Sequence, residues 1–389
     1  YFEGIQSRMI QLDSKLSDVG VTIFTVMSQL ANDYQAINLS QGFPDFDAAP
    51  DLIQRVAEHM RAGNNQYAPM QGIPVLRRKI AEKVQNLYHY NYDPDTEITV
   101  TSGATEALYA AITAVVRTGD EVIIFEPAYD AYAPVIRLNN GIPVFLQLKP
   151  PDYRIDWDVV ADSLSERTRL IILNSPHNPT GSILNKSDMA ALDTILANTG
   201  TLILGDEVYE HIVFDHQPHE SIIRHPSLAA RSFVVSSFGK TYHTTGWKIG
   251  YCLAPAALSR EFQRVHQFLT FSSNTPIQLA YADILDRKDL YHGLASFYQD
   301  KRDAFLSYME GSRFKPVPCS GTYFQMMQYD AISDLPDIEF ARWMTIEHGV
   351  ASIPVSVFYH TKTDHHVVRF CFAKKVETLE RAAEKLCRI

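Results

Sequence analysis

Short apolar runs of strand length alternate with longer helical patterns from Glu97 onward, and this alternation limits the fold more than any other feature of the chain. A strand predicted over 98–101 leads into a helix predicted over 105–116, which is apolar nearly all round and is followed by Arg117 and Gly119 as stop signals. Alternating strands and helices of these lengths build a largely parallel sheet with helices on both faces. The sequence therefore predicts an α/β fold.

Further strands are predicted downstream, each bounded by Gly, Pro, Asp or Asn. They cover residues 121–125, 144–148, 170–173, 201–204, 233–236 and 249–254. Ligands of open α/β sheets bind beyond the carboxyl ends of the strands. Polar residues that directly follow these strands are therefore candidates for a functional site.

The pattern changes after about Asn274, where long helices and two more strands indicate a smaller α+β unit. The helices are predicted over 276–309, 337–348 and 376–387, and the strands over 322–328 and 366–372. The N-terminal segment up to about Asp47 is too short for its own core and is expected to pack on this unit. We thus expect a large domain, residues 48–281, and a small domain, residues 9–47 and 282–389. Residues 1–8 resemble an expression-tag remnant.

The composition fits an enzyme-sized globular protein, because 389 residues with 46% hydrophobic content can bury a large core. A net charge of −10 without any basic block argues against nucleic acid or an anionic membrane as a partner. The four cysteines lack CxxC spacing, which suits a reducing compartment better than a disulfide scaffold or a zinc site. No apolar stretch reaches bilayer length and no secretory signal is recognisable, so we expect a cytoplasmic protein.

Lys240 follows the predicted strand over 233–236 in the segment SSFGKT. A lysine at the end of a buried strand can hold an aldehyde such as pyridoxal phosphate as a Schiff base. Most lysines are solvated surface charges, and the spacing SxxK also occurs in serine acyl enzymes, which would make Ser237 a nucleophile. The SDN and KTG motifs of those enzymes are absent from the sequence, so Ser237 is better interpreted as a phosphate ligand.

The turn Ser102-Gly103-Ala104-Thr105 joins a predicted strand to the start of a helix, where free N–H groups and the helix dipole favour a phosphate. Taken alone, the turn is equally typical of an ordinary tight connection with Thr105 as cap. Lys248 can add a second cation to the phosphate, although an edge lysine with a solvated ammonium has the same pattern.

The residues Asp206 and Tyr209 follow the predicted strand over 201–204 and suit the two ends of a pyridine ring. An aspartate beside the ring nitrogen keeps it protonated, and a tyrosine can donate to the ring oxygen. Asn178, locked beside a proline, can donate to the same oxygen or to a substrate carboxylate, and Tyr129 can stack on the ring. A helix cap, a rigid loop and core packing are the structural alternatives for these residues. We interpret His177 as a loop residue.

Arg369 lies in the predicted strand over 366–372, on a face shared with Val367 and Cys371. A guanidinium on such a face needs an anion, and its planar fork suits a carboxylate. A structural ion pair and the carboxylate of an α-amino acid are equally consistent with this position.

Together, these motifs resemble the class I aminotransferases, which are pyridoxal-phosphate enzymes of fold type I. The segments SSFGKTYHTTGWKIGY, TSGATEAL, NSPHNPTG and DEVYEHI occur in the family's order and approximate spacing, and the resemblance covers Gly20 to the C-terminus. The segments INLSQGFPDFD, NQYAPMQG and ITVTSGATEALYAAI look most similar to bacterial methionine aminotransferases and their kynurenine aminotransferase relatives. The resemblance implies a large domain with a mostly parallel mixed sheet and a smaller α+β domain.

The resemblance also implies roles for individual residues around pyridoxal 5′-phosphate. Lys240 is implied as the Schiff-base lysine and as proton carrier between the substrate Cα and the cofactor C4′, with Asp206 on the pyridinium. Tyr209 and Asn178 are implied for the ring oxygen and Tyr129 for the ring face. The implied phosphate ligands are Gly103, Ala104, Thr105, Ser237 and Lys248. Arg369, Asn178 and the Gly42 backbone are implied for the substrate carboxylate, and Phe24, Tyr67 and Tyr323 for the side-chain pocket. A homodimer is implied as well, with Tyr67 reaching the neighbouring subunit's phosphate.

An aromatic, uncharged pocket suits methionine or aromatic amino acids better than aspartate, because a dicarboxylate needs a second cation. The sequence thus predicts a ping-pong aminotransferase that acts on methionine, then phenylalanine, tyrosine or kynurenine, although Arg77, Arg78 or a distant residue is an alternative source of that cation. A carbon–sulfur β-lyase acting on cysteine conjugates is an alternative on the same scaffold. A ligand-sensing regulator is another, but such regulators carry a DNA-binding helix-turn-helix ahead of the domain, and we expect the stretch before Gln41 and Gly42 to be too short for one.

Overall fold

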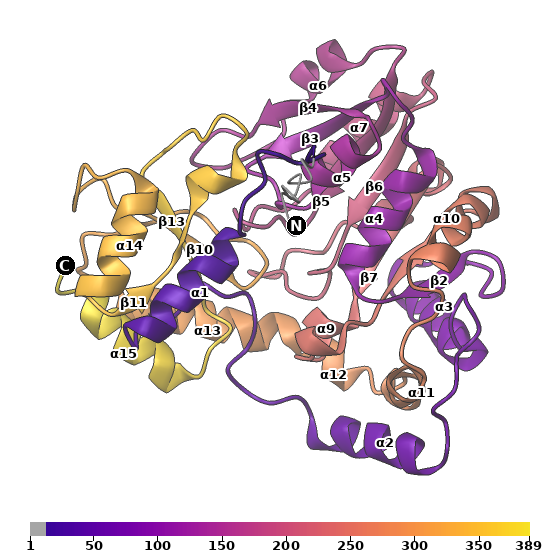
Figure 1. Ribbon diagram of the computed structural model, residues 1–389, viewed down its shortest axis with the longest axis horizontal. Coiled ribbons are helices and arrows are strands. Elements are labelled where there is room, and N and C mark those ends of the chain that lie inside the picture. The colour runs from indigo at the N-terminus through magenta and orange to yellow at the C-terminus, as the bar shows by residue number, and fades with distance from the viewer. Residues whose placement is uncertain (1–12) are drawn as a thin grey trace, which may run out of the picture.

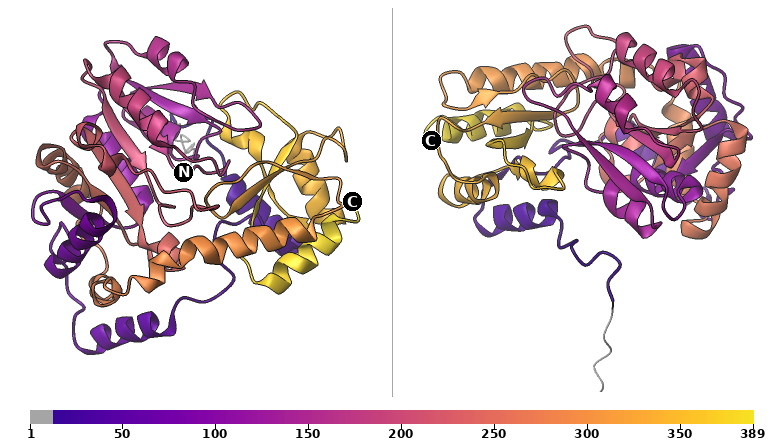
Figure 2. Two further views of the ribbon diagram at one scale, coloured as in Figure 1. Left: turned by 180° about the vertical axis from the view of Figure 1, so that it is seen from behind. Right: turned by 90° about the horizontal axis from the view of Figure 1, so that it is seen from above.

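The computed structural model describes residues 13–389, which form two larger sheets and a two-stranded one, with helices around them (Figure 1). The predicted tag remnant at residues 1–8 lies outside the described residues. Figure 2 shows the seven-stranded sheet with its helices beside a smaller part built mainly from residues after 290. Among the described residues, no helix combines the length and the apolar character needed to cross a bilayer.

The seven-stranded sheet has the strand order β2-β8-β7-β6-β5-β3-β4. Strand β8 runs antiparallel to both of its neighbours, and the other pairs are parallel. The strands are β2 (Ile98–Thr101), β3 (Glu121–Glu126), β4 (Ile142–Gln147), β5 (Thr168–Asn174), β6 (Leu202–Asp206), β7 (Ser232–Ser237) and β8 (Gly250–Leu253). The mixed, mostly parallel α/β sheet expected from the sequence is therefore confirmed.

Helices cover both faces of this sheet, and its central strands are therefore buried on both sides. Val122 in β3 packs in one cluster with α4 (Ala104–Val115), α5 (Tyr132–Leu138) and α10 (Ala256–Leu269). Its neighbour Ile123 faces the opposite side and a larger cluster. The helices that contribute to this cluster include α2 (Pro50–Arg61), α3 (Pro74–Tyr88), α6 (Trp157–Ser163), α7 (Lys186–Leu196) and α11 (Thr275–Ile284).

The smaller sheet is antiparallel and has the order β12-β13-β10-β9. Its strands are β9 (Lys315–Pro316), β10 (Phe324–Gln328), β12 (Ile353–Pro354) and β13 (Val367–Cys371). The helices around it are α1 (Ile23–Asp33), α13 (Leu294–Tyr308), α14 (Asp337–Glu347) and α15 (Val376–Leu386). Strand β1 (Ile37–Asn38) pairs in parallel with β11 (Val350–Ala351), so the N-terminal segment lies against C-terminal elements.

Several element boundaries differ from those predicted. The strand predicted over 201–204 extends to Asp206, and the strand predicted over 322–328 begins only at Phe324, because Thr322 has a left-handed φ of 68°. The apolar pattern over 249–254 revealed a strand but not its antiparallel direction, since burial on both faces leaves no signal for direction. The predicted domain boundary between residues 281 and 282 falls inside α11, and the division into two domains stays a prediction.

Candidate active site

A cavity of about 270 Å³ lies where the carboxyl ends of β2, β5, β6 and β7 meet. These four strands point the same way, because β8 is antiparallel to both β2 and β7. The predicted site residues on its wall are Phe24, Gly42, Gly103, Ala104, Thr105, Tyr129, Asn178, Asp206, Tyr209, Ser237, Lys240, Lys248 and Arg369. Residues from both sheets therefore line one space.

One end of the cavity forms a cradle for an anion. Gly103, with a φ of 80°, precedes α4, whose first N–H groups have no partner within the helix. A Cβ atom at Gly103 would lie 3.2 Å from the Lys248 Nζ, and a Cβ atom at Gly250 would lie 2.9 Å from the Ala104 backbone nitrogen. Only glycines at these positions keep the helix end and the Lys248 ammonium open to the same ligand.

Lys240 lies in the short helix α9 (Phe238–Thr241), directly after β7, and its amine lines the cavity. The Nζ is 2.8 Å from the Tyr323 hydroxyl and 3.4 Å from the Gly42 carbonyl oxygen. Burial lowers the pKa of Lys240 to about 8, and the nearby Lys248 and Arg369 cations act in the same direction. The amine is therefore partly neutral near neutral pH, as a nucleophile or general base requires.

Asp206 ends β6, and its carboxyl group is buried in the cavity wall. The Tyr132 hydroxyl donates to the Asp206 Oδ2 over 2.6 Å. Burial raises the pKa of Asp206 to about 6, while this hydrogen bond opposes the rise. Tyr132 was not predicted from the sequence, although it lies only three residues after Tyr129, and the two rings are in contact at a centroid distance of 5.6 Å.

Arg369 projects from β13 into the cavity and is only 1% exposed. Its Nη1 donates to the Asn178 Oδ1 over 2.7 Å, and its Nη2 donates to the Ser40 carbonyl oxygen over 3.2 Å. Burial lowers its pKa to about 10. Its Nε has no partner among the described residues, and no carboxylate faces the guanidinium at ion-pair distance. Of the two interpretations open at this position, a site for a carboxylate ligand fits these contacts better than a structural ion pair.

Aromatic rings surround the Arg369 guanidinium. Its Cζ lies 3.8 Å from the ring centroid of Phe324, 5.4 Å from that of Phe24 and 5.5 Å from that of Phe358. Phe324 lines the cavity and was not predicted, because it lies in a buried strand where an aromatic residue is ordinary.

Two predicted pocket residues lie elsewhere. Tyr323 is fully buried and is not on the cavity wall; it lies just before β10 with its ring against Tyr209, and its hydroxyl bonds to Lys240 and Gly42. Tyr67 is 85% exposed and packs edge-on against Phe271, so it does not line the cavity of its own chain. His177 also lies off the wall and contacts Thr180, which fits its interpretation as a loop residue.

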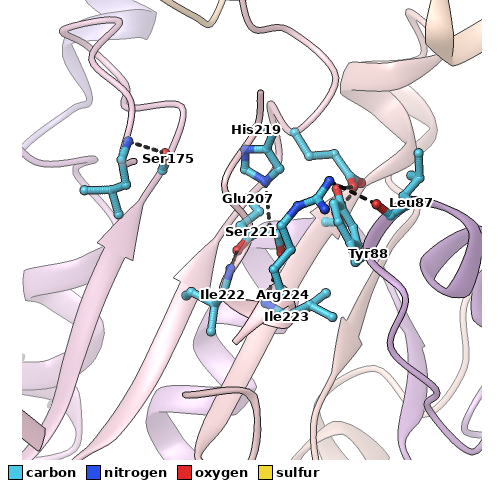
Figure 3. A network of polar contacts seen from close by, with 12 residues as sticks. Leu87, Tyr88, Ser175, Glu207, His219, Ser221, Ile222, Ile223 and Arg224 are labelled. Atoms are coloured by element: carbon cyan, nitrogen blue, oxygen red, sulfur yellow. Dashed lines mark hydrogen bonds and ion pairs between the residues drawn. The ribbon is translucent and has the colours of Figure 1, made fainter. Parts of the chain in front are cut away.

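The acidic residues that alternate with Asp206 and Tyr209 point away from the cavity. Figure 3 shows Glu207 between His219 and the backbone of Ile222; its carboxylate is 2.9 Å from the His219 Nε2 and accepts from the Ile222 N–H over 2.9 Å. Glu210 is buried with Lys83, whose Nζ is 2.7 Å away, and accepts from the Ser236 hydroxyl over 2.7 Å. These contacts attach the segment that carries Asp206 and Tyr209 to the rest of the large sheet.

The cavity fits pyridoxal phosphate. It offers a glycine-lined anion cradle at one end, a buried carboxyl group at Asp206, a partly neutral amine at Lys240 and the tyrosine rings of Tyr129 and Tyr209. Within residues 13–389, no group of three or more His, Cys, Asp or Glu side chains is arranged to hold a metal ion.

Comparison with known proteins decides the family. The family model for aminotransferase class I and II matches residues 34–386. The chain belongs to the class I and II aminotransferases. As in that family, its cofactor is pyridoxal phosphate and its fold is that of the pyridoxal-phosphate aminotransferases, as the resemblance implied.

Individual relatives support the same assignment over nearly the whole chain. The methionine aminotransferase of Escherichia coli is 55% identical over 374 residues, which are 96% of this chain and 97% of that protein. A kynurenine–oxoglutarate transaminase of Dictyostelium discoideum is 34% identical, with 96% and 95% covered. The crystal structure of YbdL from Escherichia coli, for which a methionine aminotransferase function was identified, superposes with a TM-score of 0.96 at 54% identity and covers 98% of this chain and all of its own.

Proposed function

We propose that this aminotransferase takes the amino group from methionine and from aromatic amino acids and passes it to a 2-oxo acid. The apolar wall of the cavity around Arg369 is the observation that carries the proposal: Phe24 and Phe324 lie beside the group that would hold the substrate carboxylate. The 55% identity to the methionine aminotransferase of Escherichia coli supports the same choice.

The cations on the cavity wall also disfavour a dicarboxylate substrate. Its lysines and arginine are Lys240, Lys248 and Arg369. Lys248 lies in the anion cradle and Lys240 is the reacting amine, so Arg369 alone remains for a carboxylate of the substrate. Arg77, considered above as a second cation, donates instead to the Gly72 and Pro94 carbonyls and lies off the wall. Within one chain, a side-chain carboxylate would therefore be buried without a partner.

Different residues of the chain have different roles in the reaction. Bound pyridoxal phosphate supplies an aldehyde that joins the amino group of the substrate and a ring that accepts electrons from Cα. The Gly103 turn, Ser237 and Lys248 would hold its phosphate, and the Asp206 carboxylate would keep its ring nitrogen protonated. Arg369 orients the amino acid by its carboxylate, assisted by Asn178. The Lys240 Nζ then takes up the proton that leaves the substrate Cα and holds it as an ammonium.

We further propose that the protein acts as a homodimer. Tyr67 and Phe268 are 85% and 84% exposed, and Phe271 packs edge-on against the Tyr67 ring at a centroid distance of 5.5 Å. Such a group of exposed aromatic side chains is typical of a protein interface. A second copy would cover it and bring Tyr67 toward the neighbouring phosphate cradle. Light scattering of the purified protein should give twice the chain mass, and Tyr67→Asp should shift it toward the monomer.

Half-reactions with single amino acids test the substrate proposal. The cofactor-loaded enzyme is mixed with methionine, phenylalanine, tyrosine, kynurenine or aspartate, and the visible absorption of the cofactor is followed. Methionine should change the spectrum fastest and aspartate slowest. Failure of methionine and of all the aromatic amino acids, with success of aspartate, would overturn the proposal. Pyruvate released from a cysteine conjugate faster than 2-oxo acid from methionine would instead indicate the β-lyase.

A further inference from the structure

Tyr323 contacts the catalytic amine without touching the cavity. Its hydroxyl donates to the Gly42 carbonyl oxygen over 2.6 Å, and the Lys240 Nζ donates to the same hydroxyl over 2.8 Å. The ring is fully buried and packs edge-on against Tyr209, with a centroid distance of 5.1 Å. Tyr323 precedes β10 in the smaller sheet, whereas Lys240 follows β7 in the larger one. The contact therefore joins the two sheets at the reacting atom.

The direction of these hydrogen bonds is determined by the number of protons on each group. A tyrosine hydroxyl has one proton, which the Gly42 carbonyl accepts, so towards Lys240 the Tyr323 oxygen can only accept. The Gly42 carbonyl is a second acceptor for the amine, at 3.4 Å. A lysine nitrogen has three positions besides its bond to Cε, and these two acceptors account for two of them.

We propose that Tyr323 is a positioning residue for Lys240, whose hydroxyl, fixed by the Gly42 carbonyl, holds the free amine so that the third position on Nζ faces the substrate. In the neutral amine this position holds the lone pair that takes up the α proton. In the ammonium it holds that proton. The inference rests on the proposed function, because it assigns a partner to the base of the transamination.

The role differs from the one the resemblance implied for Tyr323. A residue of the side-chain pocket would change the choice of substrate, whereas Tyr323 lies behind the wall, where its hydroxyl contacts the base and the Gly42 carbonyl. Its loss should therefore lower the rate of proton transfer and leave substrate binding nearly unchanged. Because misplacement of a reacting group by about 1 Å can lower a rate roughly 100-fold, we expect the Tyr323→Phe half-reaction to slow by about 10- to 100-fold.

Tyr298→Phe provides a matched control. Tyr298 is also fully buried, and its ring lies 5.6 Å from that of Tyr323, centroid to centroid. Its hydroxyl has no hydrogen-bond partner among the described residues. The substitution removes the same atom from the same cluster without touching Lys240.

The experiment measures the methionine half-reaction and, separately, the pH dependence with which an amine reagent labels Lys240 in the cofactor-free protein. For Tyr323→Phe we expect a slower half-reaction with KM within about twofold, and a larger isotope effect with α-deuterated methionine. The hydroxyl favours the ammonium by accepting a hydrogen bond from it, so its loss should lower the labelling midpoint below that of the wild type, which the pKa of about 8 for the buried Lys240 places near pH 8. Tyr298→Phe should match the wild type in every measurement.

Unchanged labelling and an unchanged isotope effect in Tyr323→Phe would overturn the inference. If this variant does not fold, 3,5-difluorotyrosine at position 323 keeps the ring and the hydroxyl but weakens the acceptor. It should shift the labelling midpoint downward while the fluorinated hydroxyl stays protonated and upward where it ionises, and no shift would equally contradict the inference. Because labelling requires neither cofactor nor substrate, a wild-type enzyme that fails to convert methionine would refute the proposed function alone.

Discussion

The two sides of one segment, residues 206–210, differ in the hydrogen-bond and ion-pair partners of their buried carboxyl groups. Asp206 and Tyr209 face the cavity, and within residues 13–389 the one side chain that hydrogen-bonds the Asp206 carboxylate is that of Tyr132. Glu210 faces the interior behind the cavity and contacts Lys83, Tyr88, Tyr251 and Ser236. Among the described residues, the Asp206 carboxylate is thus hydrogen-bonded only by the neutral Tyr132 hydroxyl and Val208 N–H, whereas Glu210 is paired with an ammonium.

The two carboxyl groups consequently have opposite pKa shifts. Burial raises the pKa of Asp206 to about 6. Burial acts in the same direction on Glu210, but the Lys83 ammonium and the hydroxyl donors outweigh it and hold the pKa of Glu210 well below its usual range. A buried group that the protein leaves underpaired is prepared for a ligand, whereas a paired one supports the structure.

The largest effects on activity and on stability are expected from replacing Lys240, which lies on the cavity side, and Lys83, which lies on the interior side. Lys240→Ala should lower the rate of the methionine half-reaction by about 10²- to 10⁴-fold or more, because it removes the general base and the covalent anchor of the cofactor. The free energy of unfolding should change little. Lys83→Ala should mainly lower the free energy of unfolding and change the rate of the half-reaction much less. Turnover assays and urea unfolding of both variants measure the contrast, and equal effects of the two substitutions would contradict it.

Removal of one member of the buried pair behind the cavity should destabilise the protein. Glu210→Ala leaves the Lys83 ammonium buried without its partner, which we expect to lower the free energy of unfolding by about 3–5 kcal/mol. The double variant Lys83→Met, Glu210→Leu removes both charges and should recover most of this loss. Urea unfolding of the single and double variants checks the prediction, and additive losses would show that the two residues do not act as a pair.

The pH dependence of stability should reveal Asp206 in the cofactor-free protein. Its folded pKa of about 6 lies above the value of 3.8 for an unperturbed aspartate, so the native state binds more protons and stability falls as pH rises from about 4 to about 6. At pH 8 the accumulated difference is about 3 kcal/mol. Asp206→Asn should therefore be more stable than the wild type at pH 8 by up to this amount and equal to it at pH 4. If the stability difference between Asp206→Asn and the wild type does not grow from pH 4 to pH 8, the assignment is contradicted.

The sequence predicted most of the cavity wall because its residues directly follow strands, where local patterns are clear. Asp206, Ser237 and Lys240 all lie at the ends of strongly apolar runs. The supporting pairs could not be predicted in this way. Lys83 and Glu210 are separated by 127 positions, and no local pattern indicates that they meet. Tyr323 was assigned to the pocket by resemblance, and only its three-dimensional position shows that its hydroxyl faces Lys240.

The central claim is that the Lys240 amine anchors the cofactor in the cavity that also holds Asp206. Reduction of the cofactor-loaded enzyme with borohydride, followed by mass mapping of its peptides, tests it most directly. The account predicts that the added mass of the reduced cofactor is found on Lys240 and is absent from the Lys240→Ala variant. Labelling of Lys248 or of any other lysine in place of Lys240 would contradict it.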